Sequence, residues 1–127
     1  MNANQLKNRT KSFSIAIVDL VEQLPNTISG RAVANQIIRS GTSVAANYRA
    51  VCRARSDREF IAKMHIVIEE SDETLFWLEL IDEKKWLNEE HIRMLSVEAN
   101  ELASIFVSAV KTIKSRIATS KSEPPNP

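Results

Sequence analysis

Three arginines have the spacing of one helical face. Arg39, Arg49 and Arg53 fall within an arc of about 80° if this part of the chain forms a helix at 100° per residue. Guanidinium groups make bidentate hydrogen bonds to phosphate, so such a face suits a nucleic-acid backbone. Three basic residues near the next connection would extend the face: Arg55, Arg58 and Lys63. The alternative interpretation is that these side chains pair with acidic residues of neighbouring helices or subunits.

A second group of residues combines carboxylates with hydrogen-bonding side chains. Glu70, Glu73 and Trp77 share one face of the following helix, and Ile66 gives that face a partly apolar setting. The preceding helix offers four partners for these carboxylates: Arg39, Ser40, Ser43 and Asn47. We expect a buried polar network or an interface that fixes helix register, in preference to a catalytic acid pair.

The sequence lacks the combinations that metal or nucleophilic chemistry requires. A di-iron centre in a helical bundle needs Glu-x-x-His pairs, and neither His65 nor His91 belongs to one. His65 with Glu69 at i, i+4 would supply only two metal ligands. Cys52 has no histidine nearby in its helix, and two glycines cannot build a phosphate-binding loop. We therefore predict no catalytic residue, no metal, no cofactor and no enzymatic activity.

Long helices must position these residues, because the composition disfavours strands and turns. The 127 residues include two glycines, and three of the four prolines lie in the last four positions. Apolar residues recur at helical spacing in four segments, which predicts helices over about 4–24, 30–54, 57–83 and 88–118. Short connections make successive helices antiparallel. The predicted fold class is all-α, an antiparallel up-down-up-down four-helix bundle over 1–118, followed by a disordered tail at 119–127.

Several local signals refine this prediction. Gly41 interrupts a helix at a cost of about 1 kcal/mol, so we expect the close approach of another backbone to compensate. Ser56 and Glu59 have the spacing of a capping box at the start of the third helix. Asn88 is expected to cap the fourth helix.

Charge is nearly balanced overall but unevenly distributed. The formal net charge is +1, yet the segment 31–63 carries net +5 and the segment 69–101 carries net −8. The chain has one cysteine, no apolar leader at its N-terminus and no run of about 18 apolar residues. These features lead us to expect a cytoplasmic protein with no membrane partner.

Two longer runs and several single positions carry a family resemblance. The runs are RSGTSVAAN at 39–47 and ETLFWLEL at 73–80. Further matching residues are Phe13, Ser14, Leu24, Pro25, Gln36, Ser56 and Phe60. Together they resemble, over about residues 6–115, the bacterial four-helix-bundle family known as the 23S rRNA-intervening-sequence or S23 family.

This resemblance implies an oligomeric binding protein. Members of that family assemble as rings of five bundles, and the related accessory proteins of diversity-generating retroelements bind nucleic acid and a reverse transcriptase through a basic pentameric barrel. We therefore predict a non-enzymatic homo-oligomer, a pentamer by resemblance, that binds RNA or a nucleoprotein through the basic face of its second helix. Its partner by this resemblance is RNA, a reverse transcriptase or another protein. The alternative is a protein–protein scaffold without nucleic-acid affinity, in which basic and acidic faces of neighbouring subunits meet head to tail.

Overall fold

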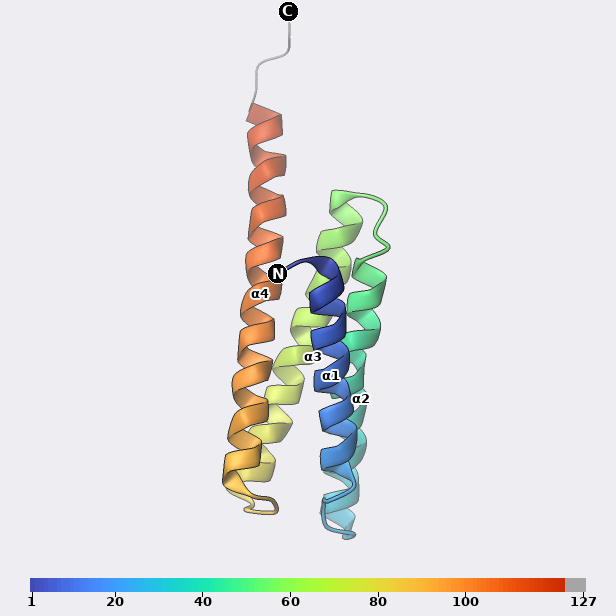
Figure 1. Ribbon diagram of the computed structural model, residues 1–127, viewed down its shortest axis with the longest axis vertical. Coiled ribbons are helices and arrows are strands. Elements are labelled where there is room, and N and C mark those ends of the chain that lie inside the picture. Colours follow the sequence, from blue (N-terminus) through green and yellow to red (C-terminus); the bar gives the residue numbers. More distant parts are fainter. Residues whose placement is uncertain (123–127) are drawn as a thin grey trace, which may run out of the picture.

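Four α-helices joined by short loops make up the computed structural model, which describes residues 1–122 (Figure 1). The helices are α1 (Ala3–Val21), α2 (Ile28–Val51), α3 (Asp57–Glu83) and α4 (Glu89–Ser122). Successive helices run antiparallel, so the start of α1, the end of α2, the start of α3 and the last third of α4 lie toward one end of the bundle. No strand occurs within the part of the chain that the structure describes, and the predicted all-α bundle is confirmed.

Side-chain caps define two of the predicted helix starts. At the start of α3, the Ser56 hydroxyl accepts the Glu59 N–H at 3.1 Å. The predicted capping box is only half formed, because the Glu59 carboxylate accepts the N–H of Arg55 at 3.2 Å. At the start of α4, Asn88 Oδ1 accepts the N–H of Glu90 at 2.9 Å, which confirms Asn88 as a cap.

The core is one apolar cluster to which all four helices contribute. Its largest fully buried side chains are Phe106, Ile17, Leu20, Ile37, Met64, Leu78, Ile81 and Leu102. Each such burial stabilises the fold by about 1.5–3 kcal/mol relative to an exposed side chain. The helices pack in chain order, α1 on α2, α2 on α3 and α3 on α4, and of the four neighbouring pairs α1 and α4 touch least. The seam between α1 and α4 is therefore the most thinly packed side of the bundle.

Gly41 lets α1 approach α2 closely. A Cβ atom at this position would lie 2.6 Å from Ile17 Cγ2, well inside van der Waals contact. The Ser14 hydroxyl also donates to the Gly41 carbonyl at 2.8 Å. The predicted approach of another backbone at Gly41 is thus replaced by close contact with two side chains of α1, those of Ile17 and Ser14.

The observed helix boundaries differ from the predicted ones by a few residues. α1 ends three residues earlier than expected, and α2 is shifted by two to three residues toward the N-terminus. α4 continues through 119–122, which we had assigned to the tail, because none of these four residues is a glycine or proline. The remaining part of the predicted disordered tail, 123–127, lies outside the described residues. None of the helices within 1–122 is both long enough and apolar enough to cross a membrane.

Candidate nucleic-acid interface

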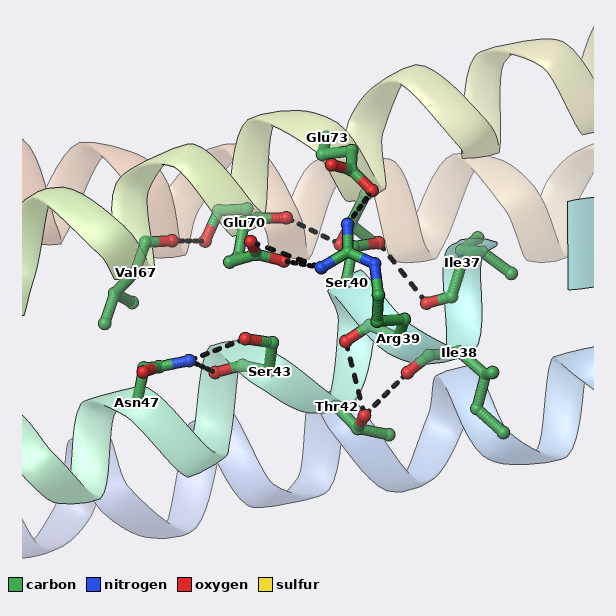
Figure 2. Close-up of polar contacts among 12 residues, drawn as sticks. Ile37, Ile38, Arg39, Ser40, Thr42, Ser43, Asn47, Val67, Glu70 and Glu73 are labelled. Atoms are coloured by element: carbon green, nitrogen blue, oxygen red, sulfur yellow. Dashed lines mark hydrogen bonds and ion pairs between the residues drawn. The ribbon is translucent and has the colours of Figure 1, made fainter. Parts of the chain in front are cut away.

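Arg39 lies apart from the other predicted phosphate-binding residues. It projects from the middle of α2 toward α3, between Glu70 and Glu73 (Figure 2). Its Nη1 is 3.3 Å from Glu70 Oε2, and its Nη2 makes a shorter contact with Glu73, which also accepts the Trp77 Nε1–H at 3.3 Å. The hydrogen bond to Glu73, followed by the charge of Glu70, raises the pKa of Arg39 above its ordinary value. Arg39 is therefore engaged by two α3 carboxylates.

The predicted polar network divides into smaller groups. Across the α2–α3 interface, the hydroxyl oxygens of Ser40 and Thr74 are 2.9 Å apart, and both residues are fully buried. Ser43 and Asn47 bond to each other within α2, with Asn47 Nδ2 2.6 Å from Ser43 Oγ, so neither reaches the α3 carboxylates in the described structure (Figure 2). Sequence reasoning missed Thr74. The signal that could have found it is its place four residues after Glu70, which sets both residues on one side of α3.

The end of α2, the start of α3 and the connection between them form a basic groove of about 450 Å³. Four cationic side chains line the basic groove: Arg49, Arg53, Arg55 and Lys63. It contains one carboxylate, that of Glu59, whose Oε1 is 3.7 Å from Lys63 Nζ. Within residues 1–122, no carboxylate lies in ion-pair range of the three arginines. Arg58, also predicted to belong to this surface, is exposed on the first turn of α3 but does not line the groove.

The basic groove is part of a larger segregation of charge along the bundle. We define the basic end as residues 1–11, 45–66 and 105–120, which carry eleven Lys and Arg against Asp57 and Glu59, net +9. The acidic end, residues 15–37 and 73–101, carries ten acidic residues against four basic ones, net −6. Antiparallel packing brings basic residues of three separate segments together and so creates this polarity.

Several members of the basic end were not among the predicted site residues. They come from the start of α1 and the last third of α4: Lys7, Arg9, Lys11, Lys111, Lys114 and Arg116. The predicted up-down topology was the signal that could have found them, since it sets these segments beside the end of α2. The basic surface therefore extends beyond one face of α2.

Arg9 differs from the rest of this group because it bridges the thin seam between α1 and α4. Its Nη2 is 2.6 Å from Glu98 Oε1 and 3.3 Å from Glu101 Oε2. The hydrogen bond to Glu98 outweighs partial burial and raises the pKa of Arg9. Arg9, like Arg39, is thus paired with two carboxylates of another helix.

The residues considered for metal or nucleophilic chemistry lie on different helices. Cys52 is exposed at the end of α2, His65 is exposed on α3, and His91 lies in the first turn of α4. His91 Nε2 is buried and has no hydrogen-bond partner within the described residues. Over the same residues, no group of three or more His, Cys, Asp or Glu side chains is arranged to hold a metal ion.

Comparison with known sequences places this helical bundle in a family. The model of the 23S rRNA-intervening sequence protein family matches residues 2–108, nearly the whole bundle. The chain belongs to this family. The resemblance carried by the runs at 39–47 and 73–80 is thereby confirmed. No functionally curated protein matches the chain.

A solved structure extends the comparison within the 23S rRNA-intervening sequence protein family. It is the 1.70 Å crystal structure of a protein of unknown function from the S23 ribosomal protein family of Bacteroides thetaiotaomicron VPI-5482. The two chains are 32% identical, and the match has a TM-score of 0.80 over 87% of this chain and 99% of the other. The four-helix fold is therefore shared with a family member, whose description gives no function.

Proposed function

We propose that the protein is a non-enzymatic RNA-binding protein that holds the RNA backbone at its basic end. The observation that carries the proposal is the basic groove, where Arg49, Arg53 and Arg55 have no acidic partner within residues 1–122. Elsewhere on the bundle, Arg9, Arg39 and Arg93 each pair with a carboxylate. Guanidinium groups left open in one groove are suited to an external anion.

The expected mode of binding is contact with phosphates. Each arginine can present a planar pair of N–H donors to phosphate oxygens, and Lys63 adds a mobile point charge. Binding releases counterions from the RNA, which makes affinity fall with rising salt and depend little on sequence. The net charge of +9 at this end would also attract RNA over a distance of about a Debye length.

A second part of the proposal is that the protein acts as a homo-oligomer, for which the family resemblance suggests a pentamer. Large apolar side chains are exposed on the two helices that border the thin seam: Ile15 and Val18 on α1, and Met94 and Val97 on α4. Met94 is 67% exposed and Val97 is 53% exposed, which favours their burial against another copy. The same observation supports the alternative of a scaffold that binds only proteins.

Fluorescence anisotropy with labelled RNA tests the RNA-binding proposal. At about 50 mM salt the protein should bind, and at about 200 mM salt the affinity should fall by at least tenfold if several phosphates are contacted. The double variant Arg49→Glu/Arg53→Glu should bind at least tenfold more weakly than the wild type at the lower salt, since two contacts become repulsive.

A matched control variant separates the effect of the groove on RNA affinity from the effect of net charge. Arg31→Glu/Lys84→Glu makes the same change in charge at exposed positions of the acidic end and should bind RNA like the wild type. Circular dichroism should show equal helicity in all three proteins. Equal loss of affinity in both double variants would reject the groove as the site. No RNA binding at the lower salt would reject the function and leave a protein partner to be sought.

A further inference from the structure

A recess of about 460 Å³ opens at the basic end, between the end of α2, the start of α3 and the last third of α4. Its apolar lining includes two aromatic and two aliphatic side chains: Tyr48, Phe60, Val51 and Ile113. Such a volume falls within the range of about 300–1,000 Å³ that is common for small-molecule sites. A combination of aromatic and aliphatic walls would accommodate a planar ring system.

Of the three charged residues that line this recess, two are arginines. Arg55 and Arg116 line it, together with Asp57, whose Oδ1 is 3.9 Å from Arg116 Nη2. At that distance, and with both side chains more than half exposed, the ion pair holds Arg116 only weakly. A charged ligand group could therefore compete for this guanidinium.

Arg55 connects the recess with the basic groove, because its side chain lines both. A strand whose phosphates follow Arg49, Arg53 and Arg55 along the groove would reach the mouth of the recess at Arg55. The next base of that strand would then lie beside an apolar surface with an aromatic ring, Phe60, that is partly open to solvent. Bases that are not paired are commonly held by stacking on such rings.

We propose that this recess receives an unpaired nucleobase of the RNA whose backbone occupies the basic groove. The inference rests on the proposed function and deepens it, because it specifies single-stranded RNA as the ligand. A duplex keeps its bases stacked and paired, so it can offer phosphates to the groove but no free base to the recess. The protein should accordingly bind single-stranded RNA more tightly than a duplex with the same number of phosphates.

Cys52 provides a way to block the recess without changing its charge. It is the chain's single cysteine, it is exposed, and it lines the recess beside Tyr48. Alkylation with N-ethylmaleimide would place a bulky neutral group there. Anisotropy at low salt would compare unstructured single-stranded RNA with the duplex, before and after alkylation, with Cys52→Ser treated identically as the control.

The expected result is a loss of single-strand affinity of about 5- to 150-fold, the range for losing one stacked base. Duplex affinity should stay unchanged, and bound single-stranded RNA should slow the alkylation of Cys52. Phe60→Leu should give the same selective loss, because it keeps an apolar side chain but removes the ring; its helicity is checked by circular dichroism.

Two results would overturn the inference while leaving the proposed function in place. One is unchanged single-strand affinity after alkylation, and the other is an equal loss for the single strand and the duplex. If the unmodified protein binds neither RNA, the proposed function fails, and this inference fails with it.

Discussion

Two stretches of α2 carry similar polar residues and use them in opposite ways. In the middle of the helix, Arg39 is held by Glu70 and Glu73, and the buried Ser40 hydroxyl meets Thr74 of α3. At the end of the helix and in the turn just after it, Arg49 and Arg53 line the basic groove, and among residues 1–122 no carboxylate lies in ion-pair range of either arginine. The polar side chains of the middle stretch are thus bonded to α3, whereas the arginines of the end stretch have no carboxylate partner among residues 1–122.

The difference arises from what α3 presents opposite each stretch. Facing the middle of α2, α3 offers carboxylates and a hydroxyl; facing the end of α2, its first turns offer Lys63 and one acidic side chain, Glu59. Residue type alone therefore does not distinguish an arginine that is paired within the fold from one that is available to a ligand. Variants of the middle stretch should change stability without changing RNA affinity, and variants of the end stretch should do the reverse.

The largest effect on stability should come from Gly41→Ala in the middle stretch. Overpacking against Ile17 costs about 1–3 kcal/mol and should exceed the roughly 1 kcal/mol gained in helix propensity. We expect a net destabilisation of up to about 2 kcal/mol in urea unfolding, with RNA affinity unchanged under folding conditions. Ala46→Gly, at an exposed position of the same helix, calibrates the propensity contribution. A Gly41→Ala variant more stable than the wild type would show that close packing of Ile17 against this glycine does not limit stability.

A smaller effect should separate Arg49 from Arg39 directly. Arg49→Ala should lower RNA affinity and reduce the slope of log affinity against log salt by about 1, while the unfolding midpoint stays the same. Arg39→Ala should lower the unfolding midpoint, because two α3 carboxylates lose their shared partner, and it should leave the salt slope unchanged. Salt titrations and urea unfolding of both variants measure this contrast. The same phenotype in both variants would remove the distinction between the two stretches.

The smallest predicted effect is a loss of stability at alkaline pH, and it arises from Tyr48 near the end of α2. Burial, followed by the neighbouring Cys52, raises the pKa of Tyr48. A raised pKa means that folding favours the protonated phenol, so this stabilisation is complete below the unfolded value of about 10 and is lost as pH rises above it. The wild-type melting temperature should therefore fall more steeply above pH 10 than that of Tyr48→Phe. Parallel melting curves for the two proteins would contradict this assignment.

The fold was predictable because its signals are local. Apolar residues at helical spacing, the caps at Ser56 and Asn88 and the shortage of glycine and proline each act within a few positions of the chain. The partial capping box at Glu59 shows the limit of such reasoning. Ser56 and Glu59 suit a reciprocal pair, yet the carboxylate has a second backbone N–H, that of Arg55, within reach.

The candidate site was predictable only in part, because its geometry depends on segments far apart in sequence. Four of the six predicted basic residues line one groove, formed by the end of α2, the connection that follows it and the start of α3. The sequence could not show that Arg39 is paired, since its two carboxylate partners lie 31 and 34 positions further along the chain. Nor could it show that Ile113 and Arg116 of α4 would share a recess with Tyr48 and Phe60.

By itself, the sequence determined four helices, their approximate ends and membership of the 23S rRNA-intervening sequence protein family. Those properties follow from short-range propensities and from runs of residues that are read in order. The tertiary structure alone decided which charges are paired and which remain open. It did so because antiparallel packing gathers basic segments from all four helices at one end and sets Glu70 and Glu73 of α3 beside the middle stretch of α2.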